Sequence, residues 1–178
     1  MALSIEIATA GILRHVVAQT RGRQPLFGDP AARARAGGML ADCCVRHHLR
    51  CLVWCVTDRC LHVVMRGAPA SITLATHELI GSRLRHGHWL STIVNQDLYL
   101  LEVARHALLA PVRAGLCRQA VNWPFSSARE LLGLLLAHAG NADFDCFVTC
   151  DQSIRHQQNF VNRSFAMVVL STNHWPSI

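Results

Sequence analysis

The chain has 178 residues, of which 51% are hydrophobic, and its formal net charge at neutral pH is +6. This length and apolar content predict one compact domain with an appendage and enough apolar side chains for a core. No apolar run is long and charge-free enough to span a bilayer, so the composition excludes a transmembrane helix.

The first residues and the cysteines indicate the cellular compartment in which we expect the protein. The beginning of the chain contains Glu6 and no basic segment, which argues against a secretory signal. The eight cysteines are therefore expected to be reduced thiols rather than a disulfide framework. We expect a cytoplasmic protein.

All 17 basic residues are arginine. A guanidinium group has a rigid fork of donors that suits phosphate, and its plane stacks on bases, so this composition favours a nucleic-acid partner. Codon usage in a GC-rich genome is the alternative explanation for the missing lysine. The excess of positive charge favours a polyanion under either explanation.

The periodicity of the apolar residues predicts alternating strands and helices along the chain. Strands are expected at 11–19, 50–56, 61–66 and 89–94, and helices at 30–45, 72–85, 98–109 and 128–138. The expected caps of these helices are, in order, Asp29 or Pro30, Ser71, Asn95 or Asp97, and Ser126 or Ser127.

This element order predicts an α+β fold. We expect an antiparallel sheet of about four to five strands with helices mainly on one face. Residues 10–138 are expected to form this domain, and 139–178 an extension for which the sequence predicts no structure.

Two segments in the second half of the chain carry a recognisable pattern. They are Arg105-His-Ala-Leu-Leu-Ala-Pro-Val-Arg-Ala-Gly-Leu116 and Asn122-Trp-Pro-Phe-Ser-Ser127. The first resembles the Arg-Tyr-Ile-His-Leu-Asn-Pro-Val-Arg-Ala-Gly-Leu signature of REP-associated tyrosine transposases, a branch of the single-tyrosine transposases. Further blocks at 11–27, 54–64 and 87–101 are similar to this family in the same order, and the resemblance fades near His138.

The resemblance implies a ferredoxin-like sheet, similar to that of RNA-recognition modules, which agrees with the predicted element order. It also implies a protein that cleaves and rejoins single-stranded hairpin DNA. In the family, two histidines on one strand and a polar residue after the helix hold a divalent cation, usually magnesium or manganese. A helix tyrosine attacks the scissile phosphate and forms a 5′-phosphotyrosine. DNA, single-stranded or hairpin, is the partner that this resemblance implies, with no role for a membrane. A monomer and a homodimer are both compatible with the sequence.

Three of these four catalytic positions differ in this chain. The positions of the two strand histidines hold Cys60 and His62, the helix tyrosine is replaced by His106, and the polar residue by Ala110. Thiolate serves magnesium poorly, and alanine offers no ligand. Tyr99, the one tyrosine of the chain, precedes His106 by seven residues, which corresponds to about 10 Å along a helix. We therefore expect the family's cleavage chemistry to be lost.

The substituted site allows two interpretations. Cys60, His62 and His106 are expected to face one another, and such a set suits zinc. Alternatively, they are remnants in a decayed pocket that binds no metal. The neighbouring pairs Cys43-Cys44 and His47-His48 also resemble a metal cluster, but we interpret them as a helix end.

Six arginines lie in the blocks that resemble the family near its DNA-facing edge. The predicted DNA-binding residues are Arg14, Arg21, Arg23, Arg59, Arg105 and Arg113. The alternative for Arg113 is a purely structural role at the carbonyl end of the helix. Trp123 is interpreted as a packing residue rather than a platform for base stacking.

Several functions remain open at this point. The chain is a transposase-like protein without cleavage activity, a non-cutting DNA-binding module that represses or guides, or a zinc-binding derivative. The product of an eroding gene is a further alternative.

Overall fold

The structure is a computed structural model that describes residues 11–20, 24–80, 87–95, 97–141, 146–149 and 166–169. The chain divides into two compact units, Met1–Arg129 and Glu130–Ile178. The predicted site lies in the first unit.

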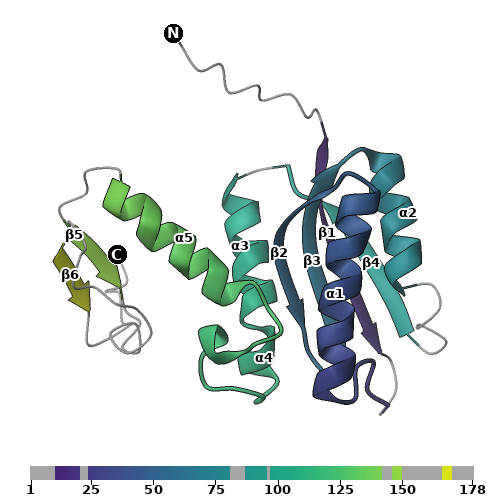
Figure 1. The fold of residues 1–178 in the computed structure, drawn as a ribbon, viewed down its shortest axis with the longest axis horizontal. Coiled ribbons are helices and arrows are strands. Elements are labelled where there is room, and N and C mark those ends of the chain that lie inside the picture. The colour runs from purple at the N-terminus through teal and green to yellow at the C-terminus, as the bar shows by residue number, and fades with distance from the viewer. Residues whose placement is uncertain are drawn as a thin grey trace, which may run out of the picture. The chain divides into compact units, whose positions relative to one another are not determined.

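A four-stranded antiparallel sheet forms the centre of the first unit (Figure 1). Its strands are β1 (Ile12–Thr20), β2 (Arg50–Val56), β3 (Cys60–Gly67) and β4 (Gly87–Ile93), in the order β2-β3-β1-β4. The predicted α+β fold with a sheet of about four strands is thereby confirmed. β1 lies between β3 and β4, although both follow it in the chain.

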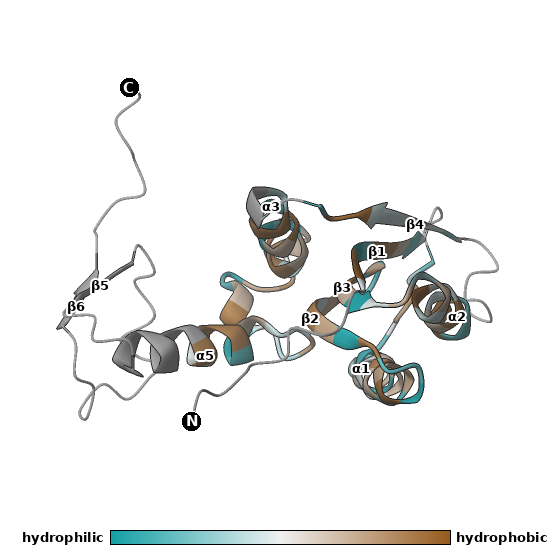
Figure 2. Ribbon diagram, turned by 90° about the horizontal axis from the view of Figure 1, so that it is seen from above, coloured by the Kyte–Doolittle hydropathy of each residue, from teal (hydrophilic) through white to brown (hydrophobic). Residues whose placement is uncertain are grey.

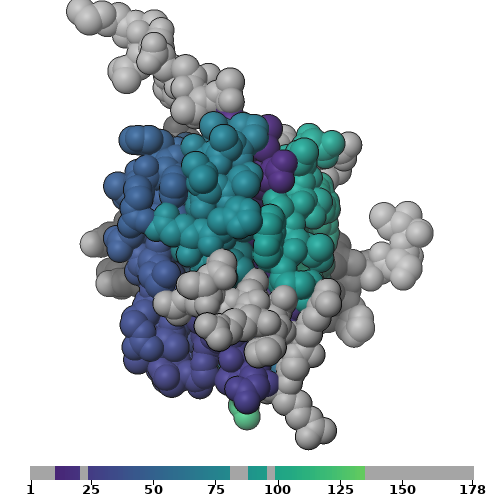
Figure 3. All heavy atoms as spheres, turned by 90° about the vertical axis from the view of Figure 1, so that its right-hand side faces the viewer, coloured from purple at the N-terminus to yellow at the C-terminus, as the bar shows by residue number. Residues whose placement is uncertain are grey.

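One face of the sheet is covered by α1 (Pro30–Arg46) and α2 (Pro69–Ile80) (Figure 2). Side chains alternate across a strand, so Val16, Val63 and Met65 point to this face, where they are almost completely buried. Leu40 of α1 and Ile72 of α2 belong to the same core. In Figure 3, which is seen from the right-hand side of Figure 1, the blue atoms of α1 adjoin the teal atoms of α2.

The opposite face carries α3 (Asp97–Leu108), which contacts β2 and β3 (Figure 2). The pairing register places Val17 opposite His62 and His15 opposite Val64. These four side chains therefore share the face toward α3, because directly paired residues point to the same side of a sheet. The site begins with this arrangement.

The ends of α1 and α2 show what the sequence predicted and what it missed. The Asp29 cap is confirmed, since its Oδ1 accepts a hydrogen bond of 2.7 Å from the Ala32 amide. The Ser71 cap is wrong, because α2 begins at Pro69 and Ser71 lies in its first turn. Proline suits the first helical position, where its missing N–H would have no partner in any case.

A short helix follows α3 directly where the sequence predicted a stop. It is α4 (Ala110–Arg113), with Pro111 in its first turn. Gly115, at φ +69°, ends it, and the Leu116 amide donates to the Pro111 carbonyl at 2.9 Å. This backbone arrangement is a Schellman-type C-cap, which explains why glycine occupies this position.

The segment 123–127 lies along the outer edge of β2, after a 3-10 turn at Ala120–Asn122. The Val56 amide donates to the Phe125 carbonyl, and the Ser127 amide donates to the Trp54 carbonyl. The Trp123 indole donates to the Val56 carbonyl at 2.8 Å, so Trp123 has a packing role. The segment thus protects an edge strand that would otherwise expose unpaired backbone groups.

α5 (Ala128–Asn141) follows this segment, and Ser126 Oγ accepts a 3.4 Å hydrogen bond from the Ala128 amide at its start. The second unit contains a parallel pair of short strands, β5 (Cys146–Thr149) and β6 (Ala166–Val169). None of the helices in the described ranges has the length and apolarity needed to cross a membrane. The cysteines whose side chains are described are free thiols, namely Cys43, Cys44, Cys51, Cys55, Cys60 and Cys117.

Candidate functional site

Two buried histidines from neighbouring strands form the centre of the candidate site. His15 on β1 and His62 on β3 are 8% and 5% exposed. Their rings stack at 5.5 Å between centroids with an interplanar angle of 14°. His15 Nε2 lies 3.3 Å from His62 Nδ1, so one nitrogen donates and the other accepts. This hydrogen bond requires that at least one ring be neutral, because two imidazolium rings have only donors.

The third histidine comes from α3. The ring of His106 contacts that of His62 edge-on, with 5.3 Å between centroids and an interplanar angle of 72°. His106 is exposed, so it lies over the buried pair and faces solvent. Residue 106 thus lies directly against the strand of His62.

The surroundings keep all three imidazoles neutral at physiological pH. Burial lowers the pKa of His15 to about 4, with a smaller contribution from His106. Burial, followed by the neighbouring His15, His106 and Arg113, lowers the pKa of His62 to about 3. Burial and the nearby Arg113 guanidinium also lower the pKa of His106. The cluster therefore offers uncharged nitrogen atoms rather than positive charge.

Cys60 lies two residues before His62 on the same strand face, but its thiol is engaged elsewhere. The Thr57 hydroxyl lies 3.0 Å from Cys60 Sγ. Burial, more than any other influence, raises the pKa of the thiol. The group is thus a neutral thiol at physiological pH and would have to lose its proton to bind a metal.

The donor set does not fit the magnesium or manganese that the family resemblance implies. Cys60 is a soft thiol rather than an oxygen ligand, and Ala110, 6% exposed, has no donor. Among the described residues, one group of three potential ligand atoms converges within 4.8 Å, and it is Cys43, His47 and Glu78 on the α1 and α2 side. Cys60, His62 and His106 do not form such a group, which gives the predicted zinc site no geometric support.

The predicted DNA-binding arginines lie in different places. Arg59 is exposed in the turn between β2 and β3, and Arg105 is exposed on α3. Arg113 is exposed on α4, where its Nη2 donates to the His106 carbonyl at 2.6 Å. This bond matches the structural role considered for Arg113. Its guanidinium also lies close enough to the histidines to lower the pKa of His62 and His106.

Arg14 lies on the other face of the sheet. It pairs with Met65 across β3, and its Nη1 donates to Ser91 Oγ at 3.1 Å. Its side chain is partly buried, and Nε has no hydrogen-bond partner. Arg21 and Arg23 lie outside the described residues.

His15 is the residue of this site that the sequence did not single out as functional. The sequence signal that could have identified His15 is its place within the apolar run of β1, because such a strand buries every second side chain. The pairing of β1 with β3 is needed to bring His15 next to His62, which is 47 residues away in the chain.

Comparison with known proteins gives a structural match. No protein-family model matches this sequence, and no characterised protein matches it in sequence. The fold is similar to the structure of a REP-associated tyrosine transposase bound to a REP hairpin, with a TM-score of 0.58. The alignment covers 75% of this chain and 86% of that chain at 11% identity. The likeness at this identity shows a shared fold, a transposase-like α+β domain.

Proposed function

We propose that this protein binds single-stranded or hairpin DNA through its transposase-like domain and does not cut it. The observation that carries the proposal is the contact between His106 and His62. An imidazole occupies the place from which a helix hydroxyl would have to attack.

The loss of cleavage follows from the chemistry of these groups. Phosphodiester transfer through a protein hydroxyl needs an oxygen nucleophile and a cation that polarises the phosphate. His106 supplies no hydroxyl, and the thiol of Cys60 is protonated and hydrogen-bonded to the Thr57 hydroxyl. The buried hydrogen bond between His15 and His62 also occupies Nδ1 of His62, so that this nitrogen is not available to a cation.

DNA as the partner is supported by fold and charge. The similar structure contains a REP hairpin, and this chain has a net charge of +6, with arginine as its one type of basic residue apart from histidine. Arg105 on α3 and Arg113 on α4 are exposed. We propose these two, with Arg59, as the phosphate-binding side chains of the described chain, because guanidinium pairs with phosphate in a forked geometry.

The test is binding and cleavage of the same labelled DNA. Fluorescence anisotropy of the full chain with a hairpin, an unpaired strand and a duplex of equal length measures affinity and preference. A denaturing gel of the same mixtures, with and without manganese, detects a covalent adduct or a shortened strand. We expect binding that favours the hairpin or the unpaired strand and weakens steeply with salt, without adduct or cleavage.

Two results would contradict the proposal. A covalent adduct that depends on manganese would show that the chemistry survives. Absence of binding at low salt, or an affinity independent of salt, would leave an eroded protein without a DNA partner.

A further inference from the structure

A second cluster of reactive side chains lies on the side of the sheet away from the histidine site. Cys43 is on α1, His47 caps that helix, and Glu78 is on α2. One potential ligand atom from each, namely Sγ, a ring nitrogen and a carboxylate oxygen, lies within 4.8 Å of the other two. We propose that these three residues form a zinc-binding site. It is independent of the DNA-binding function.

The helix positions bring these donors together. Residues four apart on a helix are neighbours on its surface, which places His47 next to Cys43. The packing of α2 against α1 adds Glu78 from a segment 31 residues further along the chain. His47 Nε2 already contacts Glu78 Oε2 at 2.8 Å. The Cys43 thiol is 1% exposed and donates to the Ala75 carbonyl at 3.6 Å.

Thiolate, imidazole and carboxylate are the three ligand types that zinc takes in proteins, at about 2.0–2.3 Å from the metal. A tetrahedral zinc with these bond lengths separates its ligands by roughly 3.5 Å. Donor pairs at the upper limit of 4.8 Å therefore need to close by about 1.3 Å, and His47 Nε2 and Glu78 Oε2, which are 2.8 Å apart, need to separate by about 0.7 Å. Side-chain torsions provide shifts of this size. On binding, the Cys43 thiol loses its proton to solvent and the sulfur coordinates the metal as thiolate.

The neighbouring groups support the site in two ways. The Arg46 guanidinium pairs with Glu78 Oε1, which orients the carboxylate as outer-shell partners of metal ligands commonly do. Oε2, which contacts His47 Nε2, is the oxygen that would coordinate the metal. The site also lies at the C-terminal end of α1, where the helix dipole favours a cation. The adjacent Cys44 does not belong to the cluster.

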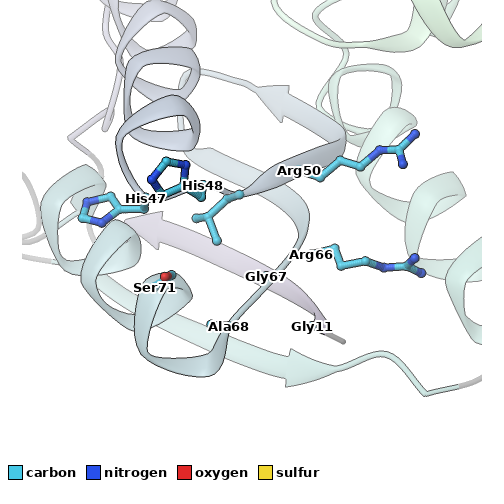
Figure 4. Close-up of a pocket in the computed structure, with 9 residues that line it drawn as sticks. Gly11, His47, His48, Arg50, Arg66, Gly67, Ala68 and Ser71 are labelled. Atoms are coloured by element: carbon cyan, nitrogen blue, oxygen red, sulfur yellow. The ribbon is translucent and has the colours of Figure 1, made fainter. Parts of the chain in front are cut away.

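The fourth coordination position is left for water or an outside ligand. His47 borders a surface pocket of about 540 Å³ whose lining also includes His48, Arg50 and Arg66. Figure 4 shows the two histidines at the end of α1 and the two arginines further along the pocket. The pocket adjoins the proposed site at His47, and its lining includes neither Cys43 nor Glu78.

The experiment uses zinc alone as the probe. The full chain is purified under reducing conditions, stripped with a chelator, and titrated with Zn²⁺ in competition with a colorimetric chelator. Cobalt substitution then reports the ligands, since a thiolate-to-cobalt charge-transfer band requires Cys43 on the metal. We expect one equivalent of zinc, with affinity reduced more than ~100-fold in Cys43→Ala, His47→Gln and Glu78→Gln, beyond the effect of losing an outer-shell partner.

Matched controls come from the same helix end and from the histidine site. Cys44→Ala and His48→Asn, in which asparagine tolerates the positive φ of residue 48, should bind zinc as the original chain does. His62→Gln should also retain the metal. Circular dichroism of each apo variant verifies folding, and Glu78→Gln, at a partly exposed side chain, provides the test if Cys43→Ala does not fold.

Failure to bind one equivalent would overturn the proposal, as would retention of zinc in folded His47→Gln and Glu78→Gln or its loss in His62→Gln. In the first case the cluster is an ion-pair clamp between α1 and α2. DNA binding is measured separately and bears on neither outcome.

Discussion

The two faces of the sheet have the same strands in common but differ in what covers them. Under α1 and α2 the side chains are apolar and closely packed around Met65 and Val63. Under α3 the corresponding rows include His15 and His62, which are buried, neutral and bonded to each other. Stability therefore depends mainly on the first face, while the second face keeps polar groups where a packed core would be more stable. Buried polar groups of this kind are typical of functional sites rather than of a core optimised for packing.

The largest expected effect comes from the apolar face. Met65→Ala removes a side chain that is 0% exposed, so the free energy of unfolding should fall by about 2–5 kcal/mol. Urea denaturation measures this change. Leu90→Ala, at a side chain that is 62% exposed on the α3 side, should change it by less than about 0.5 kcal/mol. Equal effects of the two variants would contradict the assignment of the core to the α1 and α2 face.

The pH dependence of stability tests the histidine face. His15 and His62 have pKa values of about 4 and 3 in the folded protein, below the unfolded value of about 6.5. Unfolding therefore takes up protons between these values, and stability, complete above pH 6.5, decreases as pH falls toward 4. The two residues contribute a slope of up to about 2.7 kcal/mol per pH unit near pH 5.

His62→Gln should reduce that slope by about 1.4 kcal/mol per unit, because one proton fewer is taken up on unfolding. Urea denaturation of both proteins between pH 4 and 7 measures the difference. Parallel curves would show that His62 is not held neutral in the folded protein.

A smaller effect distinguishes arginines of the two faces. Arg113, exposed beside His106, should contact phosphate, so Arg113→Gln should make the slope of log affinity against log salt shallower by about 0.7–0.9. Arg14 is bound to Ser91 on the other side, and Arg14→Gln should leave the slope unchanged. Anisotropy titrations at several salt concentrations measure both slopes. The reverse result would place the DNA on the α1 and α2 face.

The smallest effect is expected from a substitution that introduces a phenol and changes nothing else in the site. His106→Tyr places a phenol against His62, but Cys60 and Ala110 still provide no suitable cation ligands. We expect no covalent adduct with hairpin DNA and manganese on a denaturing gel. An adduct from this single variant would show that the remaining residues suffice for cleavage once a phenol is present.

The sequence by itself determined the strands, the main helices and the type of sheet. Apolar periodicity and local caps act over a few residues, so the Asp29 cap and the strand at 50–56 could be predicted directly. Local signals also compete with one another. The predicted start of α2 was wrong, because the helix begins at Pro69 and not after a cap at Ser71.

Only the tertiary structure decided which side chains meet. His15 reaches His62 through the register between β1 and β3, and Glu78 reaches His47 through the packing of α2 on α1. Separations of 47 and 31 residues leave no periodic trace in the sequence, because strand pairing and helix packing are set by the whole core rather than by neighbouring residues.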